Sequence, residues 1–285
     1  MMYFITRNLK IFFRDKSAVF FSLLAVFIII ALYVLFLGDM VAGSVPDVQN
    51  PRFLMDSWIM AGLLAVISIT TTMGAFEIMV NDKSRNISKD FYSAPLKRSA
   101  IGGGYIISAF IIGIIMSLVA LVLIELYIIS GGGSILPLGS LLQTLALIIL
   151  SVVSSSSMVF FLVSFFKSQN AFSTAATIIG TLIGFLTGIY IPISALPESV
   201  RLVIKIFPVS HSAVLFRQIF MRVPISLSFE GAPEQTVLSF KESIGVVFNF
   251  GETIVTPLAS IIYLVFTAVL FFSLAVLNIS RKSRS

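Results

Sequence analysis

The residues whose types could carry out chemistry are few in this chain of 285 residues and stand far apart. His211 is the only histidine, and cysteine is absent. Glu77 and Glu125 are isolated carboxylates within apolar stretches. A catalytic or metal site needs several acid, base or ligand groups that face one another. This spacing argues against an enzyme, and we expect the chain to bind no metal ion or cofactor.

Each of these three residues has a structural alternative to a functional role. An ionisable group within a membrane span is a functional candidate by default. Glu125 stands near the predicted outer end of its stretch, where we expect it to reach the interface or pair with another helix. Glu77 is expected to pair with basic residues of the loop that follows it. His211 is expected to cap or contact a neighbouring element rather than to act as a proton switch.

Hydroxyl groups are the other polar feature of the apolar stretches. Ser68, Thr71 and Thr72 lie in the second stretch, and Thr181 lies in the fifth. Hydroxyls in a membrane helix often bond to their own helix or to a neighbour. A mildly polar path for a transported molecule is the alternative, and the sequence leaves both open.

The elements that must position these residues are six long apolar stretches. About 20 apolar residues are needed to cross a bilayer core of about 30 Å. The composition is 58% hydrophobic and 11% charged, which leaves little polar surface for a separate soluble domain. We therefore predict an all-α integral membrane protein, with residues 1–285 forming a single domain. The predicted spans are residues 18–37, 57–79, 105–129, 138–166, 171–193 and 257–279.

Lysine and arginine gather in alternate connecting segments. With six spans, the two terminal segments, the loop 80–104 and the turn at Lys167 share one side and hold 13 Lys and Arg residues. The short segments of the other side hold only Arg52. Cytoplasmic loops carry the excess of positive charge, so both termini are predicted to be cytoplasmic and residues 194–256 to form an external subdomain. The net charge of +6 is mostly this topological signal, and no nucleic-acid partner is expected.

The segment before the first span has an amphipathic pattern. Ile5, Leu9, Phe12 and Phe13 share one helical face of residues 2–16, and cations recur on another. This pattern predicts a helix that lies in the membrane interface. The alternative is that these charges only anchor the first span.

The loop between the second and third spans contains a second amphipathic segment. We predict a short helix over residues 84–93, and Pro95 ends it. Ile87 and Phe91 are four residues apart on its apolar side, the arrangement by which a helix sets anchors into a groove of a partner. A solvated basic loop resting on lipid headgroups is the alternative.

Glycines and prolines mark the fifth span and the chain after it. Gly180, Gly184 and Gly188 recur at intervals of four and predict a smooth strip for close helix packing. Pro192 and Pro197 then break the helix near the outer surface. Residues 197–207 and 211–222 predict two short helices on either side of Pro208, each too short to span. We expect a re-entrant hairpin, with His211 just after Pro208, that shapes the outer end of a pathway, and a hairpin lying on the surface is the alternative.

The order of these segments resembles the type-two permease subunits of ATP-binding-cassette exporters over nearly the whole chain. In bacteria this family exports drugs, antibiotics, peptides or cell-surface polysaccharides. Three motifs carry the resemblance: KDFYSAPLKR at 89–98, GIYIPISALP at 188–197 and FPVSHSAVLFR at 207–217.

The resemblance implies a division of labour between chains. The helix at 84–93 would be the coupling helix that docks on a separate ATPase, and residues 2–16 would be the interfacial connecting helix. The chain has no G-x-x-x-x-G-K-[ST] phosphate loop, so ATP and Mg²⁺ would bind to the partner ATPase. The residues expected to couple to the ATPase are Ile87, Lys89, Asp90, Phe91 and Pro95.

The resemblance also implies an assembly and a cargo. Two six-span permease subunits, identical or related, would sit in the bacterial plasma membrane with a path between the second and fifth spans of each. An amphipathic drug, antibiotic or peptide is the expected cargo, and antibiotic resistance the expected consequence. Export of a lipid-linked polysaccharide by the same architecture is the alternative.

Two further function classes compete with export. An ion-coupled secondary transporter usually has related halves and helices broken near mid-membrane. We find no convincing internal repeat and few buried carboxylates. A membrane-embedded enzyme would need facing acid, base or metal groups.

Overall fold

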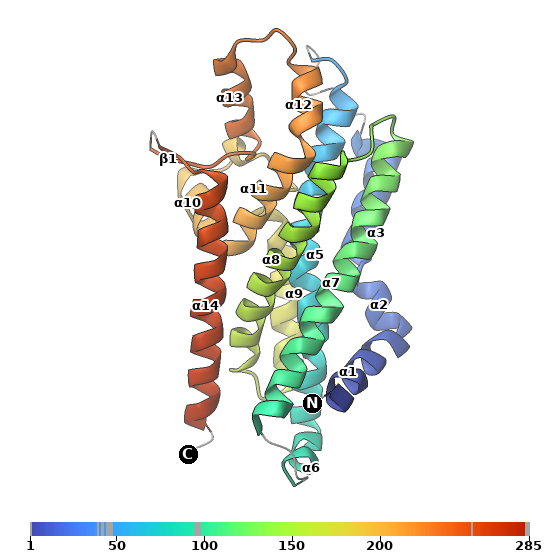
Figure 1. Ribbon diagram of the computed structural model, residues 1–285, viewed down its shortest axis with the longest axis vertical. Helices are drawn as coiled ribbons and strands as arrows, with labels where there is room; N and C mark the ends of the chain where they lie inside the picture. The colour runs from blue at the N-terminus through green and yellow to red at the C-terminus, as the bar shows by residue number, and fades with distance from the viewer. Residues whose placement is uncertain are drawn as a thin grey trace.

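Four long helices run along the length of the molecule and determine its shape (Figure 1). The computed structural model describes residues 2–38, 40, 43, 48–93, 98–251 and 253–282. The long helices are α5 (Pro51–Ser84), α7 (Arg98–Ser130), α8 (Leu138–Val163) and α14 (Pro257–Lys282).

Helix α5 forms the centre of the bundle, and α14 lies at its periphery. In the most apolar part of α5, 89% of the residues are buried, against 28% in α14. In a membrane bundle polar side chains face the interior rather than lipid, and α5 carries buried Asp56, Ser68 and Thr71. Helix α5 accordingly packs against α7, α8, α9 (Gln169–Leu186) and α11 (Pro208–Phe220). The many exposed apolar side chains of α14 are suited to lipid.

The described helices give four to six candidate membrane spans by length and composition. The four long helices qualify alone. Two bent pairs qualify together, namely α2 (Lys16–Ser22) with α3 (Leu24–Leu32), bent by 48°, and α10 (Glu198–Ile206) with α11, bent by 85°. The all-α membrane fold predicted from the sequence is confirmed at this level.

The first predicted span is bent rather than continuous. Asp15 caps α2 by accepting hydrogen bonds from the backbone N–H groups of Ser17 and Ala18 at 3.0 Å each. The Ser22 hydroxyl donates to the Val19 carbonyl at 2.8 Å, just before the break at Leu23. Such back-bonding by serine often bends helices. Beyond α3 the chain continues as a π-helical turn, η1 (Tyr33–Leu37).

The fifth predicted span is shorter than expected. Residues 171–193 were predicted to be helical, but α9 ends at Leu186. Gly188 adopts a φ of +66°, and the Ile189 N–H donates to the Gly184 carbonyl at 2.9 Å. A left-handed glycine with this bond ends a helix. The break therefore precedes Pro192, and the 18 residues of α9 cover only about 27 Å.

The two ends of the bundle carry different small elements. One end, called the α6 end, holds α6 (Ile87–Ser93), α1 (Met2–Arg14) and the end of α14, so both terminal helices reach it (Figure 1). This matches an even number of crossings. The opposite end, called the α13 end, holds elements that the sequence could not predict for residues 223–256: α12 (Arg222–Ser228), α13 (Glu234–Ser243) and a hairpin of β1 (Asn249–Phe250) and β2 (Thr253–Ile254).

Candidate functional site

Helix α6 projects beyond the bundle at the α6 end (Figure 1). It begins at Ile87 rather than at the predicted Ser84, because α5 continues through Ser84 and the chain turns at Asn86, whose φ is +60°. Of the expected coupling residues, Lys89 lies in this helix and Asp90 is exposed on it. Pro95 lies outside the described residues.

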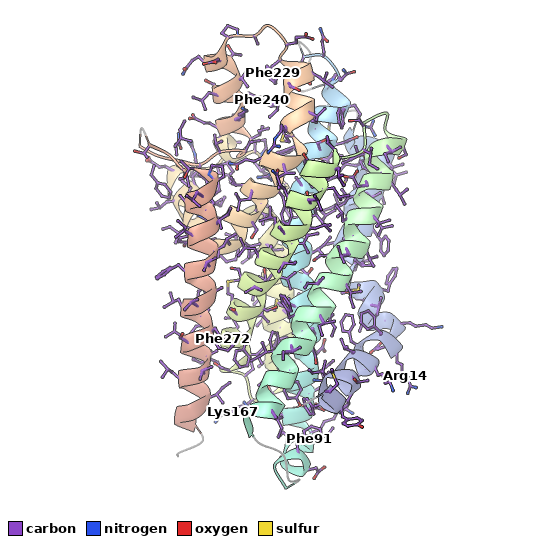
Figure 2. All side chains as sticks on the ribbon, in the orientation of Figure 1. Arg14, Phe91, Lys167, Phe229, Phe240 and Phe272 are labelled. Carbon is purple, nitrogen blue, oxygen red and sulfur yellow. The ribbon has the colours of Figure 1, made fainter. Side chains whose placement is uncertain are left out.

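Phe91 points into the protein rather than away from it. Its ring packs edge-on against Phe4 of α1, with the ring centroids 5.1 Å apart. The guanidinium carbon of Arg7 lies 5.0 Å from the Phe91 centroid, within range for a cation–π contact. Figure 2 shows Phe91 at the α6 end beside α1. Phe91 thus holds α6 on α1, and the exposed side of α6 carries Asp90.

Arg7 joins this contact to the central helix. Its guanidinium makes a bidentate pair with Asp82 of α5, with both N···O distances at 2.8 Å. Tyr105 of α7 donates to the same carboxylate at 2.6 Å. Asp82 is only 3% exposed, so the paired geometry is needed to keep a carboxylate there. The hydrogen bond to Asp82 raises the pKa of Arg7 above its ordinary value. The chain of contacts thus runs from α6 through α1 to α5 and α7.

Three of the four hydroxyls considered for a pathway are buried within α5. Ser68 donates to the Leu64 carbonyl at 3.0 Å, Thr71 to Ile67 at 2.6 Å and Thr72 to Ser68 at 3.0 Å. Each is 0% exposed. They bond to their own helix and reach no surface of the protomer. Thr181 differs, because it lies on the exposed side of α9.

The three glycines of the predicted packing strip have different surroundings. A Cβ at Gly184 would overlap the ring of Tyr190, and Gly188 lies in the turn after the helix. Gly180 is the only one of the three at which a Cβ would have open space, with no heavy atom within 4 Å apart from the neighbouring backbone of its own helix. The structure therefore leaves one open glycine on α9, on a helix whose exposed face also carries Thr177, Ile178, Thr181, Leu182 and Phe185.

A cavity of about 490 Å³ lies between α1, α2, α5 and α9, beside the Arg7–Asp82 pair. We call it the acidic cavity, because Asp15, Glu77 and Asp82 line it together with the rings of Phe12, Phe21 and Phe172. Among the described residues, Glu77 accepts a hydrogen bond from Gln169 of α9 at 2.5 Å and forms no salt bridge with a basic residue of the following loop, which was the predicted partner. The site can accommodate a molecule that has both an apolar body and a polar group.

Glu125 is held by the turn after α7. Its Oε2 accepts a hydrogen bond from the Leu136 N–H at 3.1 Å. The carboxylate thus caps the connection between α7 and α8. This role differs from the two that we expected, namely reaching the interface and pairing with another helix.

Two short helices, α10 and α11, meet at an angle of 85° beside the prolines. Pro197 precedes α10, and Pro208 is the first residue of α11. Pro192 precedes a short 3-10 turn, η2 (Ile193–Ala195). His211 lies 2.9 Å from the Lys205 carbonyl through Nε2 and 3.1 Å from the Ser260 hydroxyl through Nδ1. His211 therefore contacts both α10 and α14 from its place in α11.

Arg217 is the principal residue that the sequence reasoning missed. Its side chain is 0% exposed and donates to the carbonyls of Gly188 at 2.9 Å, Gly245 at 3.4 Å and Trp58 at 3.5 Å. Its guanidinium carbon lies 5.1 Å from the Trp58 ring, and the indole N–H donates to the Ile244 carbonyl at 2.7 Å. Within the described part of the chain no carboxylate pairs with it.

The signal for this cluster was present in the sequence. Arg217 stands among apolar residues in the hairpin, and Trp58 is the only tryptophan of the chain. A cation in such a position needs a partner. The partners are backbone carbonyls of three non-adjacent segments, which no sequence pattern identifies.

The chain matches the model of a known family. The family model described as ABC-2 family transporter protein matches residues 47–277. The matched region runs from α5 through α13 and the β1–β2 hairpin, and it includes most of α14. A comparison with curated proteins found no match.

Replacing Arg217 by Met should destabilise the protein. The variant R217M keeps most of the volume but leaves the non-helical carbonyls of Gly188 and Gly245 without their side-chain donor, each costing about 1–3 kcal/mol. Removal of a buried charge acts in the opposite direction by relieving its desolvation. We expect the lost hydrogen bonds to dominate and the thermal midpoint in detergent to fall by about 5–10 °C, from the size scaling of unfolding.

The matched control is R201M. Arg201 also donates to a carbonyl, that of Leu196 at 2.7 Å, but it is only half-buried, so water can replace it. Fluorescence-detected size exclusion after heating measures both variants. A midpoint for R217M equal to or above that of R201M would show that desolvation outweighs the carbonyl contacts.

Proposed function

The chain belongs to the ABC-2 transporter family as a membrane permease component, and we propose that it exports an amphipathic drug, antibiotic or peptide using a separate ATPase. One observation carries this proposal: a short helix, α6, projects from the bundle and is tied through Phe91 and Arg7 to Asp82 of the central helix. Such a helix is suited to receive a partner's movement and pass it to the spans.

The coupling step in this proposal uses two faces of α6. The exposed face with Asp90 contacts the ATPase, while Phe91 on the other face holds α1. Displacement of α6 then moves α1, and the bidentate Arg7–Asp82 pair moves α5 with it. ATP and Mg²⁺ bind to the ATPase in this scheme, and the permease binds neither.

The acidic cavity is the proposed place where cargo first contacts the permease. It lies between the second and fifth predicted spans, and it joins three phenylalanine rings to carboxylates. Its volume of about 490 Å³ falls within the range of small-molecule sites, about 300–1,000 Å³. A drug-sized amphipathic molecule fits these dimensions better than a long polysaccharide does.

The exposed face of α9 is proposed to meet a second permease subunit. Thr174, Thr177 and Thr181 each donate to the carbonyl four residues earlier, so their polarity is largely satisfied within the helix. Open Gly180 allows another helix to approach closely. The two subunits then enclose a mildly polar path lined by Thr181.

The test of the function is purification of the tagged chain from its native cell in mild detergent. We expect an ATP-binding-cassette ATPase in stoichiometric amount, and vesicles containing both chains to move cargo only with ATP. Transport by the permease alone under an ion gradient would instead establish an ion-coupled carrier.

Two variants separate docking of the ATPase from transmission. D90K reverses the charge on the exposed face of α6 and should lower the amount of co-purified ATPase. D82N should leave co-purification intact but lower ATP-driven transport at least about fivefold, because a charge-assisted pair contributes about 1.5–3 kcal/mol. R7Q removes the other partner of the same ion pair. Because Arg7 is more exposed than Asp82, R7Q is the control for misfolding of D82N. Normal transport in both D82N and R7Q would overturn the transmission step.

Assembly is tested at Gly180. G180L should convert the permease dimer to monomer in size exclusion with light scattering, because leucine fills the open approach on α9. G102L is the matched control, since Gly102 of α7 also has no atom within 4 Å of the place a Cβ would take. Gly184 is unsuitable for this test, because a side chain there would collide with Tyr190 of the same chain. A dimer that persists in G180L would contradict the α9 interface.

Sidedness can be read directly because the natural chain has no cysteine. We propose that the α6 end is cytoplasmic and that the membrane is the bacterial plasma membrane. In intact cells an impermeant maleimide should label E234C, on α13, and should label D90C, on α6, only after permeabilisation. The reverse labelling would invert the orientation.

A further inference from the structure

A second large cavity lies at the α13 end, on a different side of the bundle from α9. It has a volume of about 790 Å³ and lies between α8, α11, α14 and the chain around β2. Its apolar wall includes Leu147, Leu150, Leu215 and Ile261. Ala146 and Ile261 are both exposed, so the cavity opens on the outer surface of the bundle, which would face lipid in a membrane. We call it the α8–α14 cavity.

The mouth of this cavity is positively charged. Arg222 lines it and donates through Nη2 to Gln143 at 3.2 Å, and an adjoining cavity of about 220 Å³ shares Arg222 and is lined by Lys241. Among the described residues, no Asp or Glu lines either cavity, and neither cation forms a salt bridge. A guanidinium has five N–H donors, so most of those of Arg222 are free for a ligand or water.

The charged and apolar parts of the wall are arranged by depth. Helix α8 begins at Leu138, so Gln143 lies in its second turn, and Leu150 lies about 10 Å further along the helix. Arg222 stands at the level of Gln143, to which it is bonded. Arg222 therefore lies near the end of the span, and hydrocarbon lines the cavity toward the middle of the span.

We propose that the α8–α14 cavity binds an anionic phospholipid, with an acyl chain against Leu147, Leu150 and Ile261 and the phosphate held by Arg222 and Lys241. Charge complementarity favours this occupant, because anionic headgroups are attracted by lysine and arginine near the membrane surface. The volume suits a chain rather than a protein helix, which is about 10 Å across. The site differs in charge and place from the acidic cavity and does not depend on the identity of the cargo.

The test uses native mass spectrometry of the purified full-length chain with an equal mixture of phosphatidylglycerol and phosphatidylcholine. Wild type should retain one phosphatidylglycerol per chain in preference to phosphatidylcholine. The double variant R222Q/K241Q should lose this preference, with retention weakened about fivefold for each cation removed. R201Q is the matched control, since Arg201 is a cation of α10 that lines neither cavity and should leave retention unchanged.

A second pair of variants tests the apolar part with the cations intact. A146W places an indole inside the cavity against its apolar wall and should weaken retention, whereas I149W, on an exposed side of α8 that lines neither cavity, should not. Equal retention of the two lipids by wild type would overturn the proposal. So would a double variant that behaves as R201Q, or an A146W variant that retains lipid as I149W does.

Discussion

Non-helical backbone inside a membrane bundle must find hydrogen-bond partners within the protein, and in this chain Arg217 supplies them. The end of α9 and the chain near Gly245 both expose carbonyls to the interior, and one guanidinium reaches Gly188, Gly245 and Trp58. Burying the charge of Arg217 costs free energy. The arrangement is stable only if leaving these carbonyls without a hydrogen-bond donor would cost more. Gly62 completes the arrangement, because a Cβ there would lie 3.0 Å from Arg217 Nη2 and 2.7 Å from Ile189.

Helix α5 connects this cluster to the α6 end. Trp58 contacts Arg217 near one end of α5, and Asp82 binds Arg7 near the other, about 36 Å away along a continuous helix. A rigid element with a specific contact at each end is a physical route for coupling between distant sites. The proposed transmission step therefore needs no additional moving part in the centre of the bundle.

The sequence predicted the long spans well and the short, tertiary features poorly. Helices α5, α7, α8 and α14 follow from apolar length alone, and the prolines at 197 and 208 placed α10 and α11. The spacing of Ile87 and Phe91 defined an apolar face of α6 but could not say whether it faced a partner or α1. Gly188 was read as part of a helical strip because spacing carries no information about its φ of +66°.

The two large cavities are lined by residues of opposite charge. Among the described lining residues, carboxylates are the only charged groups of the acidic cavity, whereas cations are the only ones at the α8–α14 cavity and its neighbour. The acidic cavity lies against α5 and α9, whereas the α8–α14 cavity is lined by α8, α11 and α14 and, among the described residues, by none of α5. Asp82 is already paired with Arg7, so within the described part of the chain Asp15 and Glu77 are the lining carboxylates of the acidic cavity that form no salt bridge. An anionic lipid held at the α8–α14 cavity would leave the acidic cavity free for cargo, so lipid binding and transport can be altered separately.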